Sequence, residues 1–139
     1  MQIRPFAVSD QPVVVALWEA SGLTRPWNDP AKDIERKLTN QPELFLVGEH
    51  GGEVIATAMV GYDGHRGWVH YLAVAPSRRG ERLGQALMVE AERLLTELGC
   101  PKLNLMVRTG NEQVVGFYRA IGYGVDDVVV LSKRLIPDA

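Results

Sequence analysis

Apolar side chains recur along this chain at two spacings, one typical of helices and one typical of strands. The clearest helical pattern begins at Leu83 and ends where Gly99 and Pro101 interrupt it. Its inward positions recur every three or four residues: Leu87, Ala91, Leu94, Leu95 and Leu98. This spacing predicts an amphipathic helix that packs one face against a core.

Shorter patterns predict the other elements. Strands are expected over 2–6, 44–49, 53–60, 68–74, 103–107 and 125–135, where the chain is rich in β-prone residues. A first helix is expected after a cap at Ser9 or Gln11, with Pro12 in its first turn. Further helices are expected over 30–40, where Asp29 is the cap, and over 111–121. The resulting order, β-α-α-β-β-β-α-β-α-β, is that of a mixed α/β protein.

Composition narrows the class of protein. The chain has 139 residues, 46% of them hydrophobic, which suits a single domain over residues 1–139. The net charge of −2 does not suit a nucleic-acid binder, which is typically basic. No apolar run is long enough to span a membrane. The first residues also lack the basic stretch followed by an apolar run that is typical of a signal peptide. The single cysteine, Cys100, excludes an internal disulfide and a multi-cysteine metal site, so we expect a cytoplasmic protein without a metal.

A short polar stretch, Ser77-Arg78-Arg79-Gly80-Glu81-Arg82-Leu83-Gly84, joins a predicted strand to the clearest helix. The first turn of a helix leaves about four N–H groups without partners and carries partial positive charge. With three arginines and two glycines, this corner is suited to a phosphate-bearing ligand. The structural alternative is a solvated basic turn.

Two separated motifs together resemble the GNAT superfamily of acyl-CoA-dependent N-acetyltransferases. The first is Leu72-Ala73-Val74-Ala75-Pro76 followed by Arg79-Gly80-Glu81-Arg82-Leu83-Gly84, which is similar to the family's strand and phosphate loop. The second is Asn111 with Tyr118 and Gly122-Tyr123. Arg82 departs from the family pattern, which has glycine there. Only a positive φ or a crowded Cβ would require glycine, so we expect the loop to work with the arginine pointing outward.

The resemblance implies a GNAT fold, with a central, mostly antiparallel mixed sheet flanked by about four helices. It also implies an enzyme that moves an acetyl group from acetyl-CoA to a primary amine by direct attack in a ternary complex. Tyr118 is the implied catalytic acid, and a backbone N–H around Leu72 to Val74 is the implied oxyanion donor. The implied cofactor-binding residues are Leu72, Ala73, Val74, Arg79, Gly80, Glu81, Arg82, Leu83, Gly84, Asn111 and Tyr118. On local grounds alone, Asn111 could be a helix cap and Tyr118 a core residue.

The sequence indicates the general base and the acceptor-binding residues less clearly than the cofactor-binding residues. His70 shares pleat parity with Trp68 and Leu72 on the strand that leads to the phosphate loop, which makes it the candidate base. Other candidates are Glu49, Asp63 and His65, and ordinary surface roles are an alternative for each.

Trp27, Asn28 and Asp29 are candidate acceptor-binding residues, because the segment after the first helix commonly lines the acceptor side in this fold. In the structural alternative, Asp29 caps, Asn28 turns and Trp27 packs. The segments 25–30 and 61–67 also resemble a small bacterial subgroup of GNAT proteins, the YpeA-like proteins.

A rival hypothesis is a non-catalytic acyl-CoA-binding or regulatory module on the same fold. The absence of an obvious base favours that rival, whereas Tyr118 favours the enzyme. A nucleotide-phosphate binder is disfavoured because the chain has no Gly-x-x-x-x-Gly-Lys-Ser/Thr loop. The expected partner is a small-molecule or peptide amine, without nucleic acid or membrane, and an edge strand near the C-terminus could support a homodimer.

Overall fold

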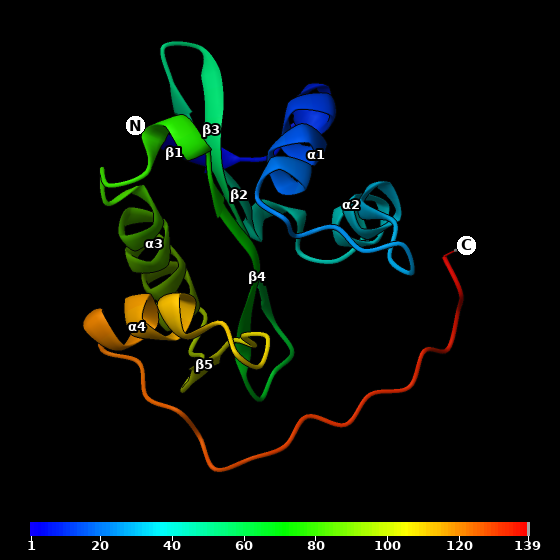
Figure 1. The fold of residues 1–139 in the computed structure, drawn as a ribbon, viewed down its shortest axis with the longest axis vertical. Coiled ribbons are helices and arrows are strands. Elements are labelled where there is room, and N and C mark those ends of the chain that lie inside the picture. The colour runs from blue at the N-terminus through cyan, green and yellow to red at the C-terminus, as the bar shows by residue number, and fades with distance from the viewer. Residues whose placement is uncertain (139) are drawn as a thin grey trace. The chain divides into compact units, whose positions relative to one another are not determined.

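The structure is a computed structural model that describes residues 1–138. The described chain falls into two compact units. The first comprises Met1–Leu105 together with Asp138, and the second comprises Met106–Pro137. Figure 1 labels the helices and strands of both.

A five-stranded sheet organises the first unit, with strand order β1-β2-β3-β4-β5. The first four strands pair antiparallel, and β5 joins β4 in parallel. The strands are β1 (Gln2–Pro5), β2 (Phe45–His50), β3 (Glu53–Tyr62), β4 (Gly67–Val74) and β5 (Leu103–Asn104). The mostly antiparallel mixed sheet that the resemblance implied is therefore confirmed.

Four α-helices accompany the strands in residues 1–138. They are α1 (Gln11–Ala20), α2 (Pro30–Leu38), α3 (Leu83–Glu97) and α4 (Glu112–Ala120). In the first unit, α1 and α2 lie on one side of the sheet and α3 on the other (Figure 1). No helix among the described residues is long and apolar enough to cross a membrane.

The start of α1 differs from the expected cap. Asp10, not Ser9 or Gln11, holds the N-cap position, and its side chain makes no cap hydrogen bond. Its carboxylate instead accepts hydrogen bonds from the Arg4 guanidinium at 2.8 and 3.0 Å and from the Ala7 N–H at 2.8 Å. This ion pair ties β1 to the segment that precedes α1, and it holds the pKa of Asp10 below its usual value. Pro12 lies in the first turn, as predicted.

The helix α3 packs closely against the sheet at Gly67, the first residue of β4. A Cβ at Gly67 would lie 2.8 Å from Leu95 Cδ1 and 2.9 Å from Cys100 Sγ, so a larger residue would force one of them to move. The Gly67 N–H donates to the Lys102 carbonyl at 2.8 Å. Gly67 is therefore the point where the end of α3, the half-buried Cys100 and the edge of the sheet pack closely together. We call this set of contacts the interlock.

Two expected strands differ from the structure. The strand expected over 103–107 is reduced to the two residues of β5. The strand expected over 125–135 is wrong, because residues 124–137 form no helix or strand. We call residues 124–137 the C-terminal segment.

Candidate functional site

The loop before α3 leaves the start of that helix open. Arg82 occupies the N-cap position with φ 60° and ψ 28°, and no side chain caps the helix. The first turn also contains no acidic residue. Gly80 has φ +86°, a left-handed conformation that glycine adopts without strain. The first N–H groups of α3 are therefore available to an anion from outside the chain.

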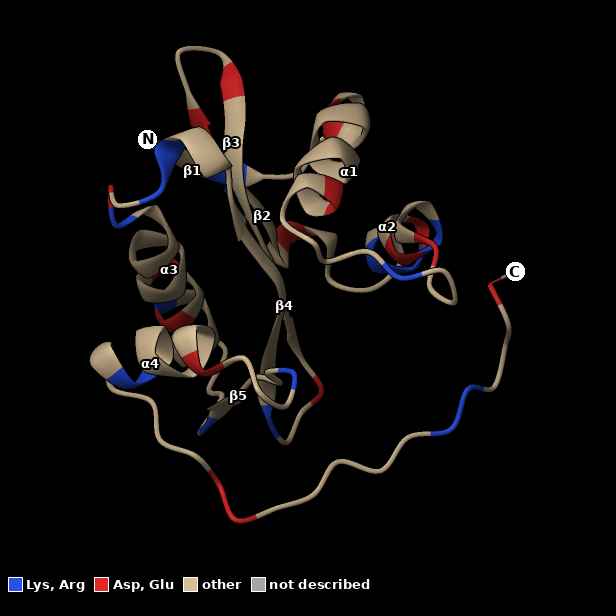
Figure 2. Cartoon of the chain, in the orientation of Figure 1, with Lys and Arg blue, Asp and Glu red and all other residues tan. Residues whose placement is uncertain are grey.

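Some charged side chains of this loop form an ion pair with each other, and others are exposed to solvent. Arg78 donates to both carboxylate oxygens of Glu81, at 2.8 and 2.9 Å, and this pairing lowers the pKa of Glu81. The Arg79 and Arg82 side chains are exposed and make no hydrogen bond or ion pair within residues 1–138. Figure 2 shows Lys or Arg positions in blue along the loop that leads into α3. Two guanidinium groups thus flank the open helix end.

Arg82 has the positive φ that favours glycine at this position of the loop. Its φ of 60° lies in the left-handed region, where an L-residue with a Cβ costs about 1–2 kcal/mol. Its side chain is exposed, as expected. The arginine therefore retains the loop conformation at the expense of backbone strain.

A β-bulge interrupts β4 near the middle of the sheet. Between the pairs Thr57–Ala73 and Met59–His70, β4 contains two residues where β3 contains one. One of the two, Tyr71, has φ 53°. A bulge disrupts the ladder and leaves one extra residue outside the regular strand pairing, so the strand that precedes the loop before α3 presents polar main chain at this point.

Side chains from three elements hold the bulge. The Tyr71 hydroxyl donates to Asp33 Oδ2 on α2 at 2.6 Å, and the Tyr71 ring stacks on Trp18 of α1 with centroids 3.7 Å apart. The Thr57 hydroxyl on β3 donates to the Tyr71 carbonyl at 2.8 Å and accepts from Trp18 Nε1 at 2.9 Å. Burial and the Asp33 carboxylate raise the pKa of Tyr71, which keeps its hydroxyl protonated.

His70 precedes the bulge. Its ring lies parallel to that of Trp68 with centroids 6.3 Å apart, which places both on one face of β4 as the pleat parity predicted. Desolvation is the main cause that lowers the pKa of His70 below 6.5; Asp33 opposes that shift and Lys37 adds to it. The imidazole is therefore neutral at neutral pH and can accept a proton.

The candidate acceptor residues lie in the loop before α2. Asn28 donates to Asp33 Oδ2 at 2.5 Å and to the Tyr71 hydroxyl at 3.2 Å, so this loop reaches the bulge. Asp29 caps α2, because its carboxylate accepts from the Ala31 N–H at 2.9 Å. Trp27 does not pack inside: 57% of it is exposed. Asp29 therefore has the structural role of the alternative interpretation, and Trp27 remains open to a ligand.

The second unit contains the other two predicted residues. Asn111 caps α4 by accepting from the Val114 N–H at 3.3 Å. Asn111, Arg108 and Arg119 line a hollow of about 400 Å³ in this unit. Tyr118 is 9% exposed, and its ring meets that of Tyr123 edge-on at 5.8 Å. Desolvation raises the pKa of Tyr118 to about 12, so the hydroxyl is protonated at neutral pH.

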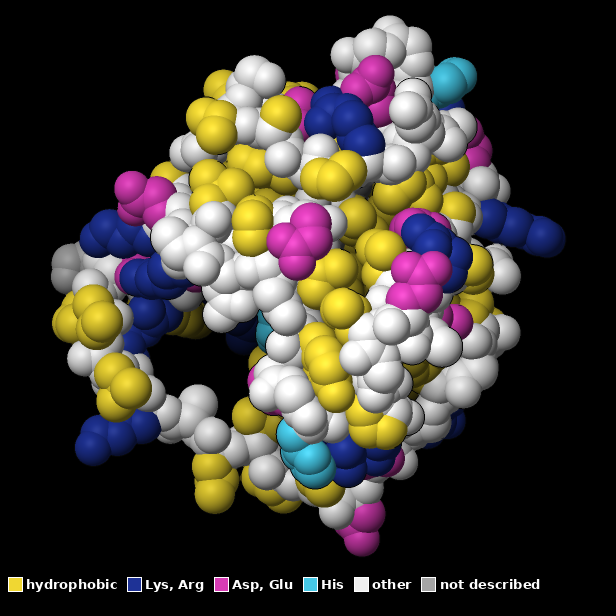
Figure 3. All heavy atoms as spheres, turned by 180° about the vertical axis from the view of Figure 1, so that it is seen from behind, with side chains coloured by type: hydrophobic (Ala, Val, Ile, Leu, Met, Phe, Trp, Pro, Cys, Tyr) yellow, Lys and Arg dark blue, Asp and Glu magenta, His cyan; other side chains and the backbone are white. Residues whose placement is uncertain are grey.

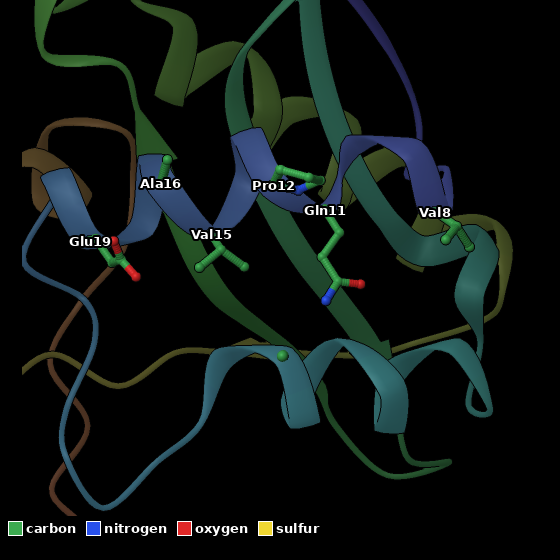
Figure 4. A pocket seen from close by; sticks show the side chains of 7 residues that line it. Val8, Gln11, Pro12, Val15, Ala16 and Glu19 are labelled. Atoms are coloured by element: carbon green, nitrogen blue, oxygen red, sulfur yellow. The ribbon is translucent and has the colours of Figure 1, made fainter.

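A further hollow lies between α1 and α2. Its volume is about 560 Å³, and Gln11 and Val15 point into it (Figure 4). None of the candidate site residues lines this hollow. No group of three or more His, Cys, Asp or Glu side chains that could hold a metal ion is found within residues 1–138.

Sequence reasoning missed Tyr71 and Asp33. Tyr71 looks like an ordinary strand residue, and nothing in the apolar pattern marks a bulge. Asp33 looks like an acidic residue in the first turn of a helix, which is common for electrostatic reasons. Their association depends on how α2 packs against β4.

Comparisons with known proteins show which family the chain belongs to. The acetyltransferase (GNAT) family model matches residues 13–123. An acetyltransferase of Yersinia enterocolitica is 51% identical over 99% of this chain and 98% of its own length, and one of Pectobacterium atrosepticum is 49% identical over the same shares.

Solved structures show the same fold. A putative acetyltransferase from Agrobacterium tumefaciens has a TM-score of 0.78 at 19% identity and covers 96% of this chain and 100% of its own. Ard1 from Thermoplasma volcanium also has a TM-score of 0.78, at 27% identity over 90% of this chain and 83% of its own. The chain belongs to the acetyltransferase (GNAT) family of enzymes.

Proposed function

We propose that the protein transfers an acetyl group from acetyl-CoA to a primary amine by direct attack in a ternary complex. We also propose that residues 1–139 form a single catalytic domain and that the protein works in the cytoplasm. The observation that carries the proposal is the uncapped start of α3 beside two exposed arginines. The narrower likeness to the YpeA-like subgroup stays a prediction.

The corner before α3 fits the diphosphate of acetyl-CoA. The open N–H groups of the first turn donate to phosphate oxygens, and Arg79 and Arg82 supply planar cationic donors. Arg78 contributes less, because Glu81 already occupies its guanidinium. Asn111 and the hollow it lines in the second unit suit another polar part of the same molecule.

The residues of the first unit support proton removal and charge stabilisation. An alkyl amine has a pKa near ~10.4 and must lose a proton before it can attack. The neutral imidazole of His70 is the proposed acceptor of that proton, directly or through water. A backbone N–H between Leu72 and Val74, beside the bulge, is the proposed donor to the developing oxyanion.

Tyr118 is the proposed general acid. Acetyl-CoA supplies the acetyl group and departs as a thiolate, whose pKa of roughly 8.5 makes it a tolerable leaving group. Because the Tyr118 hydroxyl remains protonated, it can donate to that sulfur. The help is modest, since the thiolate can leave unaided.

Thiol release from acetyl-CoA tests the proposal. The acceptors are polyamines, amino acids, antibiotics and peptide N-termini, each measured against an acceptor-free control. Acceptor-dependent release is expected for at least one class. Tight binding of acetyl-CoA without acceptor-dependent release from any class would support the non-catalytic module instead.

Tyr118→Phe separates the roles of binding and chemistry. We expect kcat to fall by about tenfold, because one proton donor is lost, while the Kd of acetyl-CoA changes by less than about twofold. Isothermal titration gives the Kd and thiol release gives kcat. Unchanged kcat would remove Tyr118 from the catalytic role.

A further inference from the structure

Lys37, in the last turn of α2, is half-buried, and its side chain makes no hydrogen bond or ion pair within residues 1–138. Paired cations are common in this protein: Figure 3 shows Lys and Arg side chains beside Asp or Glu side chains on the face that it draws. Burial is the main cause that lowers the pKa of Lys37, and Glu43 opposes this shift from beyond ion-pair distance. The Lys37 ammonium is therefore partly withdrawn from water without a bound anion in exchange.

The acid best placed to pair with Lys37 is engaged elsewhere. Asp33 lies one turn earlier on α2, at the i, i+4 spacing that favours an ion pair. Its Oδ2 accepts from the Tyr71 hydroxyl at 2.6 Å and from the Asn28 amide at 2.5 Å, and its Oδ1 accepts from Arg36 at 3.1 Å. Asp33 therefore holds the bulge and the loop before α2, and Lys37 needs its anion from another source.

The Lys37 ammonium lies over the end of β3. A Cβ at Gly61 would lie 3.5 Å from Lys37 Nζ, so the ammonium is next to the Gly61 backbone. Gln41 fixes this end of the strand, because its amide accepts from the Tyr62 N–H at 2.8 Å and donates to the Tyr62 carbonyl at 3.0 Å. The ammonium is thus beside a sheet position that contributes no side chain of its own.

His70 projects from the same face of the sheet. In the β3–β4 ladder, Gly61 pairs with Trp68, which shares its face of β4 with His70. Directly opposite residues project to one face, and diagonal positions such as Gly61 and His70 are about 7–8 Å apart. The two cations also interact, because Lys37 helps to lower the pKa of His70. A small molecule can therefore reach the ammonium and the imidazole at once.

The local charge selects a carboxylate as the missing anion. One ammonium balances one negative charge, which is the charge of a carboxylate, whereas a phosphate monoester carries about 1.5 to 2. Two acids also act on this region, since Asp33 affects His70 and Glu43 affects Lys37. These acids disfavour an anion of higher charge.

We propose that the amine acceptor carries a carboxylate, as an amino acid does, and that Lys37 binds this carboxylate while the amine lies at His70. The inference rests on the proposed acetyl transfer. Lys37 forms no covalent bond in this scheme, and its ammonium determines which amines are accepted. The acceptor is small, because its two charged groups must fit within one diagonal of the ladder.

Matched acceptors that differ in one charge test the proposal. Thiol release from acetyl-CoA is measured with each amino acid and with its primary amide. Lys37→Met keeps the apolar stem and removes the charge, so it should raise the KM of the amino acid by about tenfold or more, with kcat and the KM of the amide within about twofold. Comparing the variant with the wild type cancels the different reactivity of the two amines. Lys37→Arg should keep most of the affinity for the amino acid.

Lys32→Met is the matched control on the same helix. Lys32 is exposed and donates to the Asp138 carbonyl at 2.8 Å, so its loss should leave both KM values within about twofold. Circular dichroism checks that each variant is folded. An unchanged KM for the amino acid in Lys37→Met would overturn the proposal. An equal loss of kcat with the amino acid and the amide would also overturn it, because Lys37 would then act in the chemistry.

A binding experiment without turnover separates this inference from the proposed function. N-acetylglycine and N-acetylglycinamide differ in the carboxylate, and nuclear magnetic resonance follows the His70 ring as each is added. N-acetylglycine should bind at least about tenfold more tightly than the amide and raise the pKa of His70, and Lys37→Met should remove this difference. Without a ligand, Lys37→Met should itself raise the pKa of His70, because a positive neighbour is lost.

The two experiments can fail independently. The absence of acceptor-dependent thiol release with every amine would contradict the proposed acetyl transfer, whereas the binding of N-acetylglycine through Lys37 would still support the carboxylate site. Thiol release with amines, together with equal binding of N-acetylglycine and its amide, would overturn the carboxylate site and leave the acetyl transfer standing.

Discussion

The helices α2 and α3 begin in opposite ways. At α2, the Asp29 carboxylate caps the first turn, Asp33 adds a negative charge, and the Asp138 carboxylate accepts the Asp29 N–H. At α3, no side chain caps the first turn and no acid lies in it, while exposed arginines flank it. One helix end is satisfied by the chain's own carboxylates, and the other is the end at which we propose that an anion from outside the chain binds.

The largest expected effect comes from reversing the charge beside α3. Arg79→Glu should raise the KM for acetyl-CoA by about 100-fold, equivalent to about 2.7 kcal/mol, because a charge-assisted contact becomes a repulsion. Initial rates at varied acetyl-CoA measure the effect. Arg66→Glu, the same charge change in the turn before β4, should leave that KM within about twofold. Equal effects of the two variants would contradict a phosphate site at α3.

Making α3 resemble α2 should separate stability from binding. Gln85→Glu places a carboxylate in the first turn of α3, where it should stabilise the fold by about 0.3–1 kcal/mol. The same charge repels a phosphate, so the KM for acetyl-CoA should rise by about fivefold. Urea unfolding and initial rates give the two quantities, with Gln85→Ala as the uncharged control. A lower KM for acetyl-CoA in Gln85→Glu would contradict the idea that the start of α3 binds an anion.

Removing the cap of α2 should affect stability rather than acetyl-CoA. Asp29→Ala leaves the Ala31 N–H without its partner and should lower the free energy of unfolding by about 1 kcal/mol. Asp29→Asn keeps an accepting oxygen and should recover most of that loss. Chemical denaturation measures both variants. If the Asp29 cap stabilises α2 alone, the KM for acetyl-CoA should stay within about twofold of the wild-type value in both variants.

The smallest effect is expected at Arg82. Arg82→Gly relieves the left-handed strain, but glycine gains freedom in the unfolded chain, so the net increase in stability should be less than about 1 kcal/mol. Arg82→Ala keeps the strain and should not show that increase. Thermal unfolding distinguishes the two. A loss of stability in Arg82→Gly would show that the Arg82 side chain makes a stabilising contact.

Local patterns were sufficient to predict the elements whose stability is local. The helix α3 follows from apolar spacing, and the cap of α2 follows from Asp29-Pro30, because both depend on residues a few positions apart. The strands predicted over 44–49 and 53–60 are confirmed as β2 and β3, which pair antiparallel, with Gly51 and Gly52 both at positive φ in the turn between them.

Features that depend on distant contacts were not predictable. The bulge at Tyr71 needs Trp18, Thr57 and Asp33, which lie on three other elements. The strand expected over 125–135 has the right propensity, yet a strand also requires a neighbour, and a single chain's pattern does not name one. The expected cap of α1 failed because Arg4, on another element, holds Asp10.

The contact at Gly67 gives the protein a chemical reporter of its own. Cys100, whose Sγ would lie 2.9 Å from a Cβ at Gly67, carries the chain's single thiol and sits half-buried where α3 meets the sheet. The packing of Gly67 and Leu95 partly shields that thiol, so its alkylation should be faster when the interlock opens. The rate of labelling therefore reports how often the C-terminal end of α3 separates from β4. A ligand that binds at the N-terminal end of α3 should lower that rate.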